Sequence, residues 1–136
     1  AGRRPDPSVW RVTRSVWVAA SDAEAEDQLA DPEGPFAFYF RYLMSAFGMR
    51  KALHLVRPDG SEQHESVGWL HIARSQVAYA SPKTVLEKLV AFSERMGPYG
   101  ALLLTAHEWK DPEACRRSMR LFAEEVAPKL RRALAR

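Results

Sequence analysis

His107 is the residue of this sequence whose position best suits it to chemistry, because it directly follows a long apolar run. The run, Tyr99 to Ala106, predicts a strand buried on both faces of a parallel sheet. In (β/α)8 barrels, active sites lie at the carboxyl ends of such strands. A neutral imidazole there can hydrogen-bond a bound ligand, which makes His107 the candidate catalytic residue. The alternative is a loop histidine that only caps local structure.

Three polar residues are candidates for binding an anion. Ser81 and Thr84 fall at the amino end of a helix predicted to start at Pro82, where free N–H groups and the helix dipole favour a phosphate. An ordinary N-cap explains Ser81 equally well. Arg14 lies in the middle of a strand predicted over residues 9–19, where an unpaired buried charge is costly. It therefore needs an anionic partner, which is either an acidic side chain in a structural ion pair or a ligand.

Trp109 is the candidate substrate-binding residue, since its ring could form one wall of a hydrophobic pocket. Packing of the loop onto the sheet is the alternative for this side chain. None of the remaining histidines has the spacing of metal ligands, so the sequence predicts no metal site. Cys115 falls in the last predicted helix without a histidine near it in sequence, as expected of a packed thiol.

The elements that must position these side chains alternate along the chain. Hydrophobic patterning predicts strands over residues 9–19, 76–79 and 99–106. Helices are predicted over residues 23–30 and 36–50, from Pro82 to Gly97, and from Asp111 onward. The alternation implies right-handed crossovers and a parallel sheet. Residues 36–50 are apolar around most of a helical circumference, so this helix is expected to be covered on several sides.

Three parallel strands alone would leave two sheet edges uncovered. A (β/α)8 TIM barrel needs about 250 residues for its eight units, so the 136 residues suit about the last three of them. We therefore expect residues 1–136 to be the C-terminal portion of a single barrel domain, incomplete as a barrel, an expectation that the missing initiator Met fits. The rival is a small three-layer sandwich that dimerises to bury its edges.

Composition indicates which partners and which cellular location are expected for the protein. The net charge is +3, and much of the positive excess lies at the two ends, which is typical of solvated tails rather than of a nucleic-acid surface. A single cysteine requires no oxidising compartment, so a cytoplasmic location is expected. No apolar stretch approaches the roughly 20 residues of a membrane-spanning helix, so no membrane partner is expected.

Three stretches of the C-terminal half occur in a characteristic order. They read Gln-Val-Ala-Tyr-Ala-Ser-Pro-Lys-Thr-Val (76–85), Gly-Pro-Tyr-Gly-Ala-Leu-Leu-Leu-Thr-Ala-His-Glu-Trp (97–109) and Arg-Arg-Ser-Met-Arg-Leu-Phe-Ala-Glu-Glu-Val-Ala-Pro-Lys-Leu (116–130). This order resembles the closing end of the luciferase-like, flavin-dependent monooxygenases, of the limonene and long-chain alkane monooxygenase type. The opening Trp-Arg-Val-Thr-Arg-Ser-Val (10–16) is similar to an earlier βα unit of the same proteins. Two departures are Ala80, where the family usually has Gly, and Ala127, where it often has Met.

The resemblance implies a TIM barrel that binds reduced FMN, supplied by a separate flavin reductase, and inserts one oxygen atom from O2 into a hydrophobic small molecule. It gives His107 and Trp109 places in the site and implies a homo-oligomer. Most flavin contacts would lie on strands outside these 136 residues, so the chain alone is expected to be inactive. Two rival functions stay open: a non-catalytic α/β dimerisation or interaction domain, and an anion-binding or nucleic-acid-binding protein that uses the basic ends.

Overall fold

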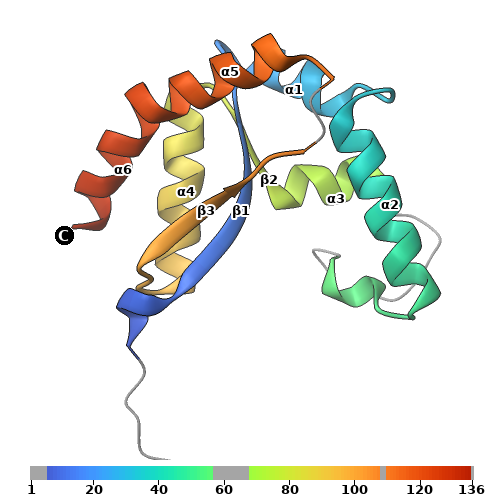
Figure 1. Cartoon of the computed structure of the whole chain (residues 1–136), viewed down its shortest axis with the longest axis horizontal. Helices are drawn as coiled ribbons and strands as arrows, with labels where there is room; N and C mark the ends of the chain where they lie inside the picture. The colour runs from blue at the N-terminus through green and yellow to red at the C-terminus, as the bar shows by residue number, and fades with distance from the viewer. Residues whose placement is uncertain (1–5, 57–67, 108–109, 136) are drawn as a thin grey trace, which may run out of the picture.

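The computed structural model describes residues 6–56, 68–107 and 110–135. Strands and helices alternate along these ranges (Figure 1). In chain order the elements are η1 (Pro7–Val9), β1 (Arg11–Val18), α1 (Asp22–Ala30), α2 (Pro35–Met49), η2 (Leu53–Leu55), α3 (Trp69–Gln76), β2 (Val77–Ala80), α4 (Pro82–Met96), β3 (Ala101–Thr105), α5 (Pro112–Leu121), η3 (Phe122–Val126) and α6 (Ala127–Leu134). The short elements η1 and η2 are 3-10 turns, and η3 is a π-helical turn through which α5 continues into α6.

The sheet is parallel, as the alternation of strands and helices predicts. Its three strands have the order β2-β1-β3, so the first strand of the chain is central. β2 pairs with residues 15–18 of β1, and β3 pairs with residues 11–15. β3 ends at Thr105, opposite Ser15, near the middle of β1. The residues that follow β3 therefore lie beside the middle of β1 rather than beside its carboxyl end.

Helices cover both faces of this sheet, and each face has its own core. On one face, α1, α2 and α3 pack against β2 through a cluster that includes Leu29, Phe40 and Ile72. On the other face, α4, η3 and α6 pack through a cluster that includes Leu89 and Val126. Because successive strand residues point to opposite faces, Val77 belongs to the first core and Ala78 to the second.

Local signals in the sequence account for the helix ends. Ser21 caps α1, since its hydroxyl accepts a hydrogen bond from the Glu24 N–H at 3.1 Å. The Glu24 carboxylate accepts in return from the Ala20 N–H at 3.2 Å, one residue before the position of a standard capping box. Gly97 ends α4 with φ of 76°, a left-handed conformation that suits glycine. Ala80 lies within β2 and has no positive φ, so an alanine is tolerated where the family that the sequence resembles usually has glycine.

Two burial predictions were wrong. β3 was expected to be buried on both faces, but it is an edge strand, and Leu103 and Leu104 are 47% and 44% exposed. α2 was expected to be covered on several sides, yet Phe38 and Tyr42 are each 65% exposed. An apolar run indicates a preference for burial, but it does not supply the neighbouring element that would cover it.

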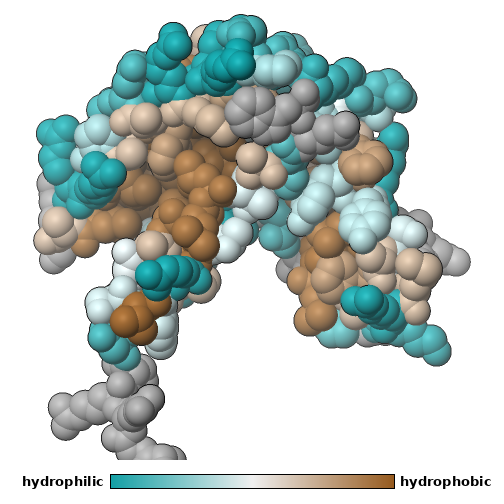
Figure 2. Space-filling view, in the orientation of Figure 1, coloured by the Kyte–Doolittle hydropathy of each residue, from teal (hydrophilic) through white to brown (hydrophobic). Residues whose placement is uncertain are grey.

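Exposed apolar side chains also gather in one hollow of the molecule. Figure 2 shows hydrophobic side chains over β3 and α4, beneath the arch formed by α5 and α6. Leu104 and Met119 are among the exposed residues of these elements. Among the helices that the structure describes, none is long and apolar enough to cross a membrane.

Candidate active site

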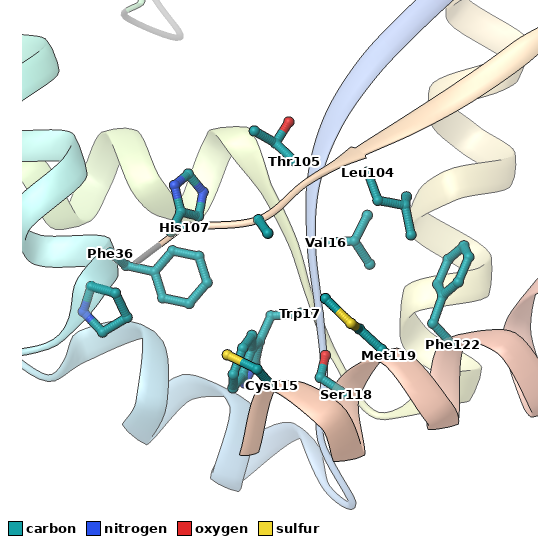
Figure 3. A pocket seen from close by; sticks show the side chains of 12 residues that line it. Val16, Trp17, Phe36, Leu104, Thr105, His107, Cys115, Ser118, Met119 and Phe122 are labelled. Carbon is teal, nitrogen blue, oxygen red and sulfur yellow. The ribbon is translucent and has the colours of Figure 1, made fainter. Parts of the chain in front are cut away.

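A cavity of about 220 Å³ opens between β1, β3 and the start of α5 (Figure 3). Its wall is mainly apolar, and its polar groups are few. The lining residues are Val16, Trp17, Pro35, Phe36, Leu104, Thr105, Ala106, His107, Cys115, Ser118, Met119 and Phe122. Apolar pockets with a few convergent polar groups are the usual form of small-molecule sites.

His107 lies at one end of this cavity and is held by both polar and aromatic contacts. Its Nε2 atom is 3.0 Å from the Ser15 hydroxyl oxygen. The Tyr39 ring centroid is 4.3 Å from the imidazole centroid, and the Phe36 ring meets the imidazole edge to face at 5.1 Å. The prediction that places this histidine beyond the carboxyl end of its strand is confirmed. The catalytic role remains a prediction.

Burial lowers the pKa of His107 below its ordinary value of 6.5, because desolvation disfavours the imidazolium ion. At neutral pH the ring is therefore neutral, with one nitrogen that donates and one that accepts. A neutral imidazole in an apolar wall can donate a hydrogen bond to a ligand oxygen or accept one from a ligand hydroxyl.

The first turns of α5 close the cavity on the side of β1. Asp111 starts the helix, since its carboxylate accepts from the N–H groups of Glu113 and Ala114, both at 3.0 Å. The Ser118 hydroxyl then accepts from the buried Val18 N–H at 2.8 Å. The Val18 N–H lies beyond the part of β1 that pairs with β3, so this bond gives a buried backbone donor its partner. It also fixes α5 against β1. Cys115 is a buried thiol of the same wall, as its position in a helix predicted.

The predicted phosphate site at the amino end of α4 already holds an anion of this chain. The Asp22 carboxylate accepts from the Ser81 N–H at 2.8 Å and from the Thr84 hydroxyl at 3.1 Å. The pKa of Asp22 is lowered chiefly by hydrogen bonding with the Ser81 side chain and the Ser81 backbone, and to a smaller extent by the Thr84 hydroxyl and the charge of Lys88. Ser81 and Thr84 thus tie the start of α1 to the start of α4. Phosphate binding by these two residues remains a prediction, and it requires the carboxylate of Asp22 to give way.

Among the described residues, Arg14 meets neutral partners, and the predicted anionic partner remains a prediction. Its guanidinium donates to the Ser75 carbonyl at 2.8 Å and to the Gln76 side-chain oxygen at 3.4 Å, and it lies 5.1 Å from the centre of the Phe92 ring. Within residues 6–56, 68–107 and 110–135 it forms no ion pair. A cation at the last turn of α3 satisfies a free carbonyl and complements the helix dipole, which explains how the charge is tolerated. Burial, followed by the charge of Arg95, lowers the pKa of Arg14.

The candidates therefore separate in space. Of the candidates that the structure describes, His107 lines the cavity of 220 Å³, whereas Ser81, Thr84 and Arg14 lie outside its wall. Trp109, the predicted substrate-binding residue, lies outside the described residues. In the described part of the chain, no group of three or more His, Cys, Asp or Glu side chains could hold a metal ion.

Sequence reasoning missed the residues that make the environment of His107. Ser15 comes from β1, 92 residues earlier in the chain, and Tyr39 comes from α2. The run of aromatic residues in α2 indicated a core helix, but no local signal could pair it with a histidine on another element. The staggered pairing of β3 with β1 brings Ser15 and His107 together, and the position of α2 adds Tyr39.

The chain is similar in sequence to known monooxygenases. The chain matches no family model. It is 31% identical over 132 residues to 3,6-diketocamphane 1,6-monooxygenase of Pseudomonas putida, a match that covers 96% of the chain and 34% of the relative. It is 31% identical over 130 residues to 4-hydroxyprotoasukamycin monooxygenase of Streptomyces nodosus subsp. asukaensis, covering 94% of the chain and 32% of the relative.

The fold has a solved counterpart. A type II Baeyer-Villiger monooxygenase, the oxygenating constituent of 3,6-diketocamphane monooxygenase from Pseudomonas putida in complex with FMN, superposes with a TM-score of 0.77 at 31% identity. The match covers 94% of this chain and 35% of that one. The chain is similar to FMN-dependent monooxygenases. It spans about a third of the length of the proteins it matches.

Proposed function

We propose that this chain is part of a flavin-dependent monooxygenase that inserts one oxygen atom from O2 into a hydrophobic small molecule. The observation that carries the proposal is the apolar cavity with a neutral histidine in its wall. It is supported by the structural similarity, at 31% identity, to a monooxygenase in complex with FMN. A hydrophobic substrate is favoured because the described residues of the wall offer aliphatic, aromatic and sulfur groups, and among them the imidazole is the one acidic or basic ring.

The residues present fit part of a flavin site. The faces of a flavin ring or a hydrophobic substrate are suited to contact with Trp17, Phe36 and Phe122, and His107 offers one directed hydrogen bond. The amino end of α4 does not fit a phosphate as it stands, since Asp22 occupies it. We therefore propose that this chain supplies the wall beside the reacting groups, and that phosphate contacts come mainly from other strands.

Reduced FMN, when bound, would supply the reaction with dioxygen, and we propose that a separate reductase provides it. This chain then has two tasks: to position the substrate and to exclude water from the cavity. His107 holds or donates a proton toward a substrate or cofactor oxygen, while the cover formed by α5 keeps water from the cavity. A homo-oligomer and a cytoplasmic location also remain proposals.

We further propose that the three strands belong to a larger (β/α)8 barrel. The match to about a third of each relative's length supports this, as do the exposed leucines of β3, which a further strand would cover. In a barrel of consecutive units, β2 would lie between β1 and β3. Here β1 is central and pairs with β3, and the cavity lies between these two strands. The strand order is therefore the observation that speaks against a barrel of consecutive units.

The test uses the whole protein that carries this chain, with a flavin reductase, a panel of hydrophobic cyclic ketones and ¹⁸O2. A monooxygenase incorporates one ¹⁸O atom into the product, as mass spectrometry detects. His107→Ala is expected to lower the rate of product formation about a hundredfold, and His71→Ala, on the exposed side of α3, is the matched control. Absence of labelled product from every ketone, with a stable dimer that has no flavin affinity, would favour the non-catalytic interaction domain instead.

A further inference from the structure

The outer face of α2 is an apolar surface that the described residues leave uncovered. Phe38 and Tyr42 are each 65% exposed, and Met49 is 80% exposed. Their spacing along α2 places all three on one side of the helix. The opposite side packs against α1 and α3 through the core that includes Phe36 and Phe40. α2 lies on the opposite side of the molecule from α4 and α6 (Figure 1), so this face is separate from the hollow beneath α5 and α6.

The two ends of this face differ in shape. A groove of about 600 Å³ runs beside Phe38, and residues 32–45 supply its lining together with Lys110. Because α2 and the turn before it build most of this groove, its existence does not depend on the strand with which β3 pairs. At the other end lies Met49, the most exposed large hydrophobic side chain of the described residues. The helix thus presents a groove at one end and a protruding, flexible side chain at the other.

These two ends are complementary in an antiparallel pair of α2 helices. Where the two helices cross midway between Tyr42 and Ser45, Tyr42 of each copy lies opposite Ser45 of the other. Phe38 of each copy then lies opposite Met49, because both pairs are centred on the same point of the helix. A large side chain therefore faces a small one at the centre, and a thioether meets an aromatic ring at each end, which is a favourable contact. A twofold axis makes the two ends equivalent, as in most homodimers.

The charges that flank α2 favour the same arrangement. Glu33 precedes the helix, Arg50 and Lys51 follow it, and all three are exposed. Within the described residues none of them forms an ion pair. In the antiparallel pair, Glu33 of each copy approaches the basic end of the other copy, whereas a parallel pair would bring like charges together.

We propose that the outer face of α2 binds the same face of a second copy of this protein, in a twofold-symmetric antiparallel dimer. The proposal goes beyond the monooxygenase activity and does not depend on it, since none of Phe38, Tyr42 and Met49 lines the 220 Å³ cavity. It also differs from the dimer of the rival sandwich, which would bury the edges of the sheet.

The first test measures the dimer dissociation constant of the whole protein that carries this chain, without flavin, by analytical ultracentrifugation. Tyr42→Lys should weaken the dimer about thirtyfold, the effect of losing one central interface residue. Met49→Lys, at a side chain that is 80% exposed and so not needed for folding, should also weaken it. Asp27→Lys, on the exposed side of α1, is the matched control and should leave the dissociation constant unchanged.

A charge exchange tests the antiparallel orientation. Glu33→Lys should weaken the dimer about tenfold, because a twofold dimer loses two ion pairs at once. Adding Arg50→Glu and Lys51→Glu to Glu33→Lys should restore the wild-type dissociation constant. The same two glutamates in the absence of Glu33→Lys should weaken the dimer, since each basic end then becomes acidic and meets Glu33.

Crosslinking locates the interface. Ser45→Cys lies beside the proposed twofold axis, so a short bismaleimide should link the two copies through this residue, as mass spectrometry of the linked peptides detects. Asp27→Cys should give no such link. The proposal would be overturned by a monomeric wild type in which Ser45→Cys does not react with maleimide, because the rest of the domain would then cover this face. It would equally be overturned by a dimer that Tyr42→Lys does not weaken and that Ser45→Cys does not link, because that dimer would use another surface.

Discussion

At the scale of single residues, the neutral state of His107 has a measurable effect on stability. Its folded pKa lies below the unfolded value of 6.5, so between these two values the unfolded chain binds more protons than the folded chain. The free energy of unfolding therefore rises with pH through this window. The contribution of His107 is fully present above pH 6.5 and is lost as the pH falls through the folded pKa.

Replacing His107 with Gln should remove this part of the pH dependence. We expect the difference in unfolding free energy between wild type and His107→Gln to change between pH 7 and pH 5, as followed by urea denaturation. His71→Gln, on an exposed position of α3, serves as the control for the loss of an imidazole at the surface. A pH-independent difference for His107→Gln would show that the ring is not desolvated.

Asp22 is the second residue whose charge has structural consequences. Its hydrogen bonds with Ser81 and Thr84 lower its pKa below the ordinary 3.8, so its stabilising effect is present above pH 3.8 and is lost as the pH falls through the folded pKa. Asp22→Ala should lower the melting temperature at pH 7, with a smaller difference from wild type at pH 2.5. Asp27→Ala, on the exposed side of the same helix, should have little effect at either pH. Equal effects of the two substitutions would contradict this account.

At the scale of elements, the sequence predicted most of what local chemistry controls. The cap at Ser21, the start of α5 at Asp111 and the stop at Gly97 depend on residues within a few positions of one another, and all three were predictable. The exposure of β3 and the pairing of His107 with Ser15 depend on the order of the strands, which no local pattern contains. The parallel sheet could be predicted, but its central strand could not.

The amphipathic stripe of α4 gives the clearest prediction about an element. Leu89 is 0% exposed and joins the core between the sheet and the final helix. Leu89→Ala should therefore cost about 2–5 kcal/mol in unfolding free energy, the usual range for a buried leucine. Leu134→Ala, at a leucine that is 44% exposed in α6, should change it by about 0.5 kcal/mol or less. Chemical denaturation distinguishes the two, and equal losses would mean that α4 does not form this core.

At the scale of the whole molecule, the open question is the pairing of β3. Thr13 and Leu103 are direct partners across β1 and β3. Neighbouring strands lie about 4.8 Å apart, within reach of a disulfide bond. The pair Thr13→Cys and Leu103→Cys, in a Cys115→Ser background, should oxidise to a crosslink in the 136-residue chain. In a whole protein with a barrel of consecutive strands, the same pair should not crosslink. Crosslinking in both would argue against the barrel and for an open sheet with helices on both faces.

The exposed apolar surface belongs to the same scale. Leu104 and Met119 are 44% and 48% exposed, and Figure 2 places hydrophobic side chains together in the hollow beneath α5 and α6. An uncovered surface of this kind normally contacts something else in the working protein. The barrel proposal assigns it to further strands of the domain, whereas the rival sandwich assigns it to a second copy.

The measurement that tests the central claim most directly is the affinity for FMN of the whole protein that carries this chain. Reduced FMN would be titrated under anaerobic conditions, with wild type, His107→Ala and the matched control His71→Ala. The account predicts saturable binding that is about fivefold to tenfold weaker in His107→Ala, the loss of one directed hydrogen bond, and unchanged in His71→Ala. Binding of equal strength in all three proteins, or no binding in wild type, would contradict the assignment of this pocket to a flavin-dependent monooxygenase.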